Sequence, residues 1–361
     1  MKKFALYLPQ FHEIEENNEW WVKGFTEWTH VKAAKPLFEK HQQPQEPLNN
    51  NYYNLLDKET VQWQTNLASE YGIDGFVYYH YYFEGKLIME KPAENLLAWK
   101  DISQKFFFCW ANHSWYKAVD GKKTLLIEQT YGNEEEWEKH FEYLLPFFLD
   151  KRYEKKDNKP LFMIFNSDYS EMKRMFLYFD KKCKENGFAG IYLIETYMGN
   201  ADQKSIQTYA TQTCEQTQML YLREPVLAQK LMLGEFHSLK WYMKAIWNEM
   251  HKRIAIKFKG FVPKYSGSKM FQLMAKKEEY KIDGVDIAHG LFFGWDNTPR
   301  HGSRGYIITC PEEQYVLEYY YIIKNDEYVF INAWNEWAEG MMLEPTEKDG
   351  YRNLELIKKL K

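Results

Sequence analysis

The sequence lacks the features that mark membrane-spanning, disulfide-bonded and zinc-binding proteins. Its 361 residues contain no run of 18 apolar residues, so no transmembrane helix is predicted. The four cysteines are widely spaced and form no CxxC pair, which indicates neither a zinc site nor a disulfide framework. The first residues become polar too soon for a signal peptide. We therefore expect a cytoplasmic protein.

Motifs for cofactors and nucleic acids are also missing. There is no HxH, HExxH or DxDxD cluster, no GxSxG elbow, and no GxGxxG after the first apolar run. Basic residues number 47 and acidic residues 51, giving a net charge of -4 and no basic stripe. We expect no metal, no cofactor and no nucleic-acid partner.

Aromatic residues are abundant, at 18% of the chain, with 13 Trp, 28 Tyr and 24 Phe. Many of them must fill the core, but the number exceeds what a core alone needs. Tyr and Trp combine an apolar body with a polar tip, which suits a cleft that binds carbohydrate. Some of these rings are therefore expected to line a surface or a cleft.

Short apolar runs alternate with segments of helical period, which predicts an α/β protein with a parallel sheet covered on both sides. Eight runs in this length indicate a (β/α)8 TIM barrel with long βα loops. A doubly wound sheet is the alternative. The runs are 4–8, 76–79, 106–110, 161–165, 191–194, 208–214, 285–293 and 329–331.

Three of the connecting segments carry clear helix signals. Asn133 precedes a run of glutamates and an apolar stripe that reaches Phe148, which is typical of a capped helix. Two other stripes, 61–71 and 172–183, are followed by Gly72 and Gly187 at the position where helices end. Residues 218–282 are the least regular and read as an insertion, so we expect one barrel domain spanning 1–361.

The stretch from Trp334 to Gly340 carries two acids among tryptophans, directly after the last apolar run. Carboxylates perform the proton transfers of glycosidases, and here Glu336 and Glu339 are the predicted catalytic pair. In a continuing strand, an offset of three would place the two side chains on opposite faces. If both serve one site, the chain must turn at Trp337-Ala338. The alternative is an ordinary helix start capped by Asn335.

Other polar and aromatic residues follow the predicted strands, where the active sites of such barrels lie. We expect substrate contacts from Gln10, His12, Glu27, Trp28, Tyr78, His80, Trp110, Asn112, His113, Glu195, Trp295, Asp296, Trp334, Asn335 and Trp337.

Each of these residues also has a structural interpretation. Gln10 and His12 could close the rim, Glu27 could start a helix, and Asp296 could form a turn with the residues that follow it. Glu344 and Glu347 are expected to be solvated.

Together these motifs resemble the WbsX-type proteins, which are encoded with enzymes of bacterial O-antigen and capsule assembly. The resemblance runs over nearly the whole chain and rests on 7–12, 24–28, 74–81, 110–112, 295–300 and 334–340. That group is similar to glycoside hydrolase family 99, the endo-α-mannosidases, which are (β/α)8 barrels. The signal shared with family 99 is the N-E-W-x-E-G core, where this chain has Ala338 in place of the usual His.

The resemblance implies a retaining glycoside hydrolase without an enzyme nucleophile. Glu336 would remove the proton from the sugar 2-OH, and Glu339 would protonate the leaving oxygen. Attack by O2 needs a 1,2-trans linkage, as in an α-mannoside or α-rhamnoside. The substrate would be an oligosaccharide or polysaccharide of the bacterial surface, or its precursor.

Three alternatives stay open. The site could transfer the sugar, as a glycosyltransferase or transglycosidase of O-antigen, lipopolysaccharide or capsule assembly. The chain could be a non-catalytic glycan-binding barrel, or a structural barrel whose aromatic rims contact a partner. The basic stretch 252–264 permits peripheral contact with membrane-bound glycan assembly machinery.

Overall fold

The structure is a computed structural model that describes residues 1–119, 122–166, 172–197, 212–215, 228, 230–233, 262–276 and 286–360. The amphipathic segment 241–256 and most of the basic stretch lie outside these ranges, as do 167–168, 208–211 and 285. Within the described ranges, no helix combines the length and apolarity that crossing a membrane requires.

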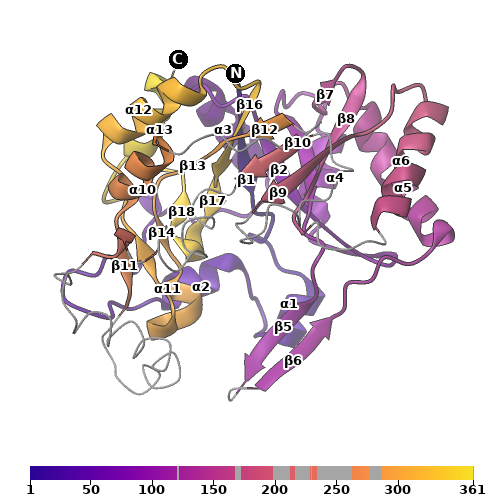
Figure 1. The fold of residues 1–361 in the computed structure, drawn as a ribbon. Helices are drawn as coiled ribbons and strands as arrows, with labels where there is room; N and C mark the ends of the chain where they lie inside the picture. Colours follow the sequence, from indigo (N-terminus) through magenta and orange to yellow (C-terminus); the bar gives the residue numbers. More distant parts are fainter. Residues whose placement is uncertain are drawn as a thin grey trace.

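A parallel sheet forms the centre of the molecule (Figure 1). Its strand order is β12-β10-β9-β8-β4-β2-β1-β16-β13. Seven of the predicted apolar runs each overlap one of these strands, and the eighth, 285–293, contains two of them. Their bounds are β1 Lys2–Tyr7, β2 Gly75–Phe83, β4 Lys105–Trp110, β8 Lys159–Ile164, β9 Tyr192–Tyr197, β10 Gln212–Glu215, β12 Asp286–Ala288, β13 Gly290–Phe292 and β16 Tyr328–Asn332.

The fold is mixed α/β, and the described pairings give an open strand order rather than a closed ring. The two ends of that order, β12 and β13, are separated along the chain by the single residue His289. β1 lies between β2 and β16, with Phe4 opposite Gly75 and Lys2 opposite Tyr328. The strand nearest the N-terminus is thus paired with one from residues 328–332.

Helices pack around the sheet, with α5 and α6 on one side and α10, α12 and α13 on the other (Figure 1). The predicted helix signals are confirmed: the Asn133 side chain accepts a hydrogen bond from the Glu135 N–H, and Gly72 and Gly187 have φ values of +77° and +87°. The helices are α1 Glu15–Trp20, α2 Glu27–Ala33, α3 Lys58–Glu70, α4 Lys91–Ala98, α5 Glu134–Leu149, α6 Met172–Glu185, α10 Gly267–Met274, α11 Thr298–His301, α12 Glu313–Ile323 and α13 Arg352–Lys359, with 3-10 turns η1 Leu48–Asn50, η3 Gly302–Arg304 and η4 Trp337–Glu339.

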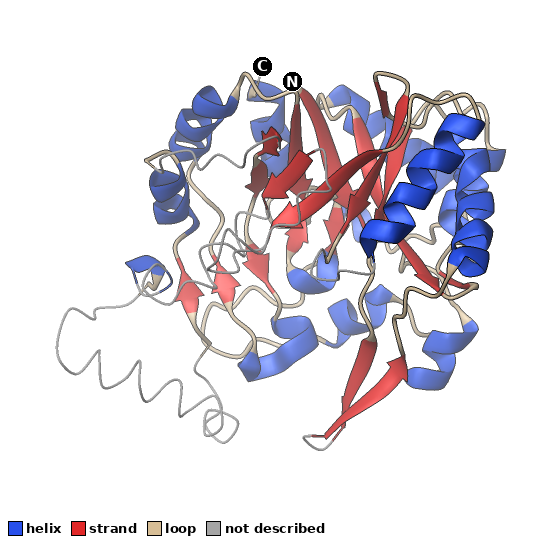
Figure 2. Cartoon of the chain, turned by 45° about the vertical axis from the view of Figure 1, so that its right-hand side comes forward, coloured by secondary structure: helices blue, strands red, loops and turns tan. Residues whose placement is uncertain are grey.

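Additional short strands, which were not predicted, pair either with the central strands or with one another. The hairpin of β5 and β6 projects away from the body of the molecule (Figure 2). These additional strands are β3 Lys86–Ile88, β5 Trp115–Val119, β6 Lys122–Ile127, β7 Lys155–Lys156, β11 Lys264–Tyr265, β14 Trp295–Asp296, β15 Ile307–Ile308, β17 Asn335–Glu336 and β18 Met341–Met342.

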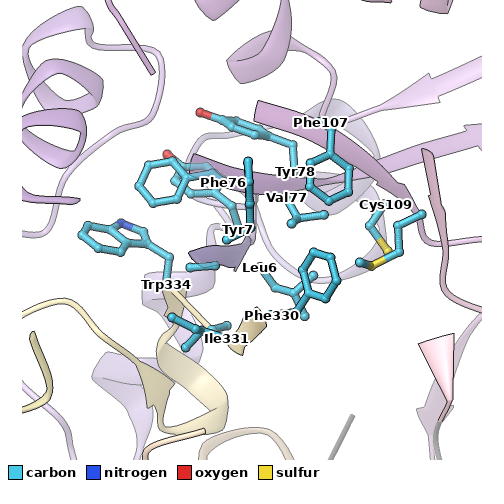
Figure 3. Close-up of a cluster of buried hydrophobic side chains, with 14 of the residues drawn as sticks. Leu6, Tyr7, Phe76, Val77, Tyr78, Phe107, Cys109, Phe330, Ile331 and Trp334 are labelled. Carbon is cyan, nitrogen blue, oxygen red and sulfur yellow. The ribbon is translucent and has the colours of Figure 1, made fainter. Parts of the chain in front are cut away.

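Alternate residues of the central strands build two different layers (Figure 3). One layer joins Phe107 to the rings of Phe4 and Phe330, at centroid distances of 5.2 and 6.1 Å. The other layer lies on the face that the helices cover, where Tyr7 packs on Tyr78 at 4.3 Å and donates a hydrogen bond to Gln64 of α3. Which layer a residue joins decides whether it can reach a site at the strand ends.

Candidate active site

The two predicted catalytic acids lie on a tight turn after the last strand of the sheet. β17 ends at Glu336, the 3-10 turn η4 carries the chain to Glu339, and Gly340 follows in the left-handed conformation with φ +59°. β18 then returns antiparallel to β17. The turn that two acids three residues apart require is therefore present at Trp337-Ala338.

Two neighbouring side chains fix this turn to the body of the protein. Asn335 accepts a hydrogen bond from the Leu8 N–H at 2.7 Å and donates one to the Leu8 carbonyl at 3.0 Å. The Trp337 indole N–H donates to Glu344 at 2.6 Å. Both side chains are buried, so they hold the backbone while the glutamates point elsewhere.

Glu336 and Glu339 contact the same guanidinium group, that of Arg300 in α11. Arg300 Nη1 donates to Glu339 Oε1 at 2.5 Å, and Nη2 lies 3.2 Å from Glu336 Oε2. Nη2 also donates to Oε1 of Glu27, the first residue of α2, at 2.5 Å. We call these four residues the carboxylate cluster. It draws together three segments that are far apart in the sequence.

The cluster is largely desolvated. The side chains of Glu27 and Glu336 are only 1% and 10% exposed, while those of Glu339 and Arg300 are 20% and 24% exposed. Burial raises the pKa of Glu336 to about 8, although Arg300 acts in the opposite direction. Burial alone would lower the pKa of Arg300, but the three carboxylates raise it well above its usual value. The guanidinium is therefore always charged.

Two tyrosines of β2 lie close to the cluster. Burial raises the pKa of both Tyr79 and Tyr81, and the negative charge of Glu336 raises it further. The contacts predicted from the sequence were Tyr78 and His80 instead, and both lie on the helix-covered face. His80 Nε2 is 2.8 Å from His140 Nε2 of α5, and burial lowers the pKa of His80 to about 3.

The predicted tryptophans lie mainly in the core. Trp28 donates to the Tyr53 carbonyl at 2.8 Å, and Trp110 donates to that of Tyr82 at 3.2 Å. Trp334 is fully buried against Phe76. A buried indole needs a hydrogen-bond acceptor, and backbone carbonyls supply one to the first two.

Asp296 and Asn112 organise the surrounding loops. Asp296 accepts hydrogen bonds from His41 and Gln43 at 2.9 and 2.8 Å, and its other oxygen bonds both the N–H and the hydroxyl of Thr298. This is the turn predicted as the structural interpretation, and α11 starts from it. The amide of Asn112 bridges both backbone groups of Asn166, after β8.

The remaining predicted contacts are spread around the strand ends. The Gln10 carbonyl accepts the Glu27 N–H at 2.9 Å, so Gln10 helps to place Glu27. Burial lowers the pKa of His12 to about 4 and also lowers that of His113. Trp295 packs on Tyr306.

Glu195, in β9, is only 1% exposed, and within the described ranges neither of its carboxyl oxygens has a hydrogen-bond partner. Burial raises its pKa to about 8. Among the predicted contacts it is the carboxyl that the described residues leave unbonded.

The expectation that Glu344 is solvated is wrong. Glu344 is 2% exposed and accepts hydrogen bonds from Tyr53, Gln64 and Trp337 at 2.6–2.8 Å. Burial raises its pKa to about 7. The reason is that, after β18, the chain brings Glu344 to a place where Trp337 meets two donors, Tyr53 and Gln64, that are 291 and 280 positions away. Glu347 is exposed, as expected.

Sequence reasoning missed Arg300, Tyr79 and Tyr81 as members of the site. Arg300 had one usable signal, since it follows the Asp296 turn and is the cation of a segment that otherwise carries an acid and aromatics. Nothing in the run Tyr78–Tyr82 distinguishes one face from the other, because every residue in it is Tyr or His.

No three His, Cys, Asp or Glu side chains of the described ranges form a group that could hold a metal ion. In the carboxylate cluster, the central cation is the guanidinium of Arg300. Such a cluster can hold and move protons next to a bound ligand.

Comparison with known proteins gives a family match over residues 3–357, to the family described as Glycosyltransferase WbsX. Two proteins named WxcX, from two strains of Xanthomonas campestris pv. campestris, are each 28% identical over 360 residues. These alignments cover 96% of this chain but 48% of each relative, so the chain spans about half the length of the curated relatives it matches.

Solved structures with similar folds include two of the GH99 endo-α-mannosidase from Bacteroides thetaiotaomicron, one of them in complex with bis-tris-propane. The complex superposes with a TM-score of 0.54 at 12% identity, covering 99% of this chain and 95% of that chain. The other structure of that enzyme gives 0.53. A glycoside hydrolase-like protein gives a TM-score of 0.59, also at 12% identity, covering 99% and 93% of the two chains.

Proposed function

The chain belongs to the glycosyltransferase WbsX family, and we propose that it is a glycan-processing enzyme that cleaves a 1,2-trans glycosidic bond. The linkage would be that of an α-mannoside or α-rhamnoside in a bacterial surface polysaccharide or its precursor. The observation that carries the proposal is that Glu336 and Glu339 meet at one guanidinium in a largely dry site. A pair of carboxyls with unequal surroundings is what proton transfer to and from a sugar requires.

In the proposed reaction, Glu336 removes the proton from the 2-OH of the sugar, and O2 attacks C1 to form a 1,2-anhydro sugar. Glu339 gives a proton to the departing oxygen. In the second half, Glu339 takes a proton from water, the water oxygen attacks C1, and O2 recovers its proton from Glu336. Two inversions at C1 give net retention. The roles of the two acids come from the resemblance to family 99.

The charge of the cluster favours hydrolysis or transglycosylation over use of a sugar-nucleotide donor. Three carboxyls surround one guanidinium. A diphosphate would bring further negative charge among these acids, and like charges at such distances repel. A neutral donor whose transition state gains positive charge suits the same surroundings. Transfer to a second sugar in place of water is the second candidate function.

We further propose that residues 1–361 form one barrel domain. β12 pairs with β10 and β13 pairs with β16, and only His289 separates them. Counting 286–292 as a single bent strand gives eight parallel strands in a ring. This arrangement would place the carboxylate cluster at the end of the eighth strand, where the catalytic groups of such barrels lie. The predicted contacts Tyr78, His80, Trp110 and Trp334 would then support the site from the helix-covered face.

The test replaces the proposed acid. Glu339→Gln keeps the size and removes the titrating proton, so turnover of the natural glycan should fall at least about 100-fold while glycan binding, measured by calorimetry, stays within a few-fold. Glu347→Gln is the matched control, because Glu347 is an exposed glutamate of the following segment. Full turnover by Glu339→Gln on a glycan with an unactivated leaving group would refute the assignment, whereas an activated aryl glycoside needs no acid and is unsuitable.

A further inference from the structure

The contact between Arg300 and Glu339 conflicts with the proton that Glu339 must carry as an acid. A guanidinium that donates to a carboxyl favours its ionised form. Arg300 Nη1 lies 2.5 Å from Glu339 Oε1 and donates to no other described carboxyl. In this arrangement Oε1 of Glu339 accepts a hydrogen bond from the guanidinium, whereas the proposed reaction needs Glu339 to donate one to the leaving oxygen.

The other half of the same guanidinium is held differently. Nη2 is shared between Glu27 at 2.5 Å and Glu336 at 3.2 Å. The Glu27 side chain is only 1% exposed and begins α2, so it is a fixed partner. Glu339 is 20% exposed, which makes it the most accessible of the three carboxyls around the guanidinium. The contact to Glu339 is therefore the one that a bound glycan can replace.

Glu336 is the carboxyl that the surroundings leave closest to neutral. It is more buried than Glu339, and it shares its Arg300 nitrogen with Glu27, at the longer distance. Two carboxyls this close titrate as a pair, so one proton belongs to both. The other titratable groups that face them are His30 and His301, together with Tyr79 and Tyr81.

We propose that Arg300 is a positioning residue that decides which of the two catalytic carboxyls holds their shared proton. With Nη1 on Glu339, the proton resides on Glu336 and the site is inactive. When a glycan displaces that contact and the guanidinium turns toward Glu336, the proton moves from Glu336 to Glu339. Glu336 is then the base and Glu339 the acid, and no external proton is consumed. This inference rests on the proposed function.

The charge states can be measured without a substrate. Protein labelled with 13C at the glutamate carboxyls would be followed by NMR over a pH series, with signals assigned from Glu336→Gln and Glu339→Gln. In the wild-type protein, Glu339 should be ionised at pH 6.5 while Glu336 is protonated. In Arg300→Gln, the ratio of protonated to ionised Glu339 at that pH should rise at least about tenfold.

Arg304→Gln is the matched control, because Arg304 is an exposed arginine four residues along the same segment, and it should leave both carboxyls unchanged. If Arg300→Gln does not fold, Arg300→Lys answers the question, since a single ammonium nitrogen cannot occupy the positions of both Nη1 and Nη2 and should give an intermediate ratio. Identical Glu339 charge states in the wild-type protein and the Arg300 variants would overturn the inference. The NMR result stands whatever the substrate is, so a failed cleavage assay would count only against the proposed function.

Discussion

At the scale of single residues, the protein holds three carboxyls at a cost to its stability. Glu195, Glu336 and Glu344 are each buried, and burial raises the pKa of each to about 7 or 8. Glu336 and Glu344 have hydrogen-bond donors that stabilise the charged form, whereas the described part of the chain offers Glu195 none. A buried polar group without a partner in a native protein usually marks a place where a ligand or a function compensates.

Glu195→Gln tests this cost through the pH dependence of unfolding. The folded pKa of about 8 lies above the usual 4.5, so the neutral carboxyl contributes stability below pH 4.5 that is lost as pH rises to 8. Glutamine stays neutral, so Glu195→Gln should match the wild-type protein at pH 4.5 and exceed it by on the order of 2–4 kcal/mol at pH 9. Denaturant unfolding at a series of pH values measures the difference.

The exposed Glu347→Gln, with no comparable burial, should show no such divergence. A constant offset between Glu195→Gln and the wild-type protein at every pH would show that the Glu195 carboxyl is not strained by burial.

At the scale of elements, the turn that carries the two acids depends on Gly340. A Cβ at this position would lie 2.9 Å from the backbone N of Asp296, and φ is +59°. Gly340 therefore serves both for its conformation and for the close approach of the Asp296 turn. Because α11 begins just after that turn, Gly340 also sets the distance between Arg300 and the acids.

Gly340→Ala should therefore lower the free energy of unfolding by more than the strain of a positive φ alone would. Gly72 is the control, because it follows the end of α3 with a φ of +77° and a Cβ there would meet nothing within 4 Å. Gly72→Ala should lose about 1 kcal/mol of unfolding free energy, as expected for an alanine at positive φ, and Gly340→Ala about 2–4 kcal/mol. Equal losses by denaturant titration would show that the contact with Asp296 can relax.

The elements themselves could largely be predicted from the sequence, but the orientation of β2 could not. Apolar runs predicted the strands of the central sheet, and apolar stripes with their terminal residues predicted the helices α3, α5 and α6, because each of these elements carries a periodic signal. In β2, Tyr and His occupy both faces, so the residue types do not show which side chains point to which face of the sheet. A shift of one residue exchanges Tyr78 and His80 for Tyr79 and Tyr81. Only contacts with α5 and with Glu336 decide between the two sets.

At the scale of the whole molecule, Asn335 joins strands from opposite ends of the sequence. Its amide bonds both backbone groups of Leu8, which is 327 positions away. Asn335→Ala would leave a buried N–H and carbonyl without partners, so we expect a loss of about 2–4 kcal/mol in unfolding free energy. Asn353→Ala removes a longer bond to the Met342 carbonyl at 3.2 Å and a weak one from the Cys310 thiol at 3.7 Å, and it should lose about 1 kcal/mol or less. Comparable losses would argue against this role for Asn335.

The carboxylate cluster also belongs to this scale, which explains how far the sequence could predict it. Glu336 and Glu339 were visible because they share one motif with tryptophans. Glu27 was visible as a candidate, but its partner was not, since 273 residues separate it from Arg300. Glu344 was misjudged for the same reason: two of its three donors, Tyr53 and Gln64, are 291 and 280 positions away, and no local pattern reports their proximity.

The pairing of β1 with β16 has a consequence for synthesis on the ribosome. Until residue 332 has emerged, β1 has β2 on one edge and an open edge on the other. Likewise, the Leu8 backbone gains its hydrogen bonds to Asn335 only after residue 335 has been synthesised. The carboxylate cluster forms only once Arg300, Glu336 and Glu339 have been synthesised. Until residue 339 has been synthesised, the nascent chain therefore has an unfinished sheet and no acid pair, so a product that stops before this point would expose an unpaired strand edge without gaining the proposed site.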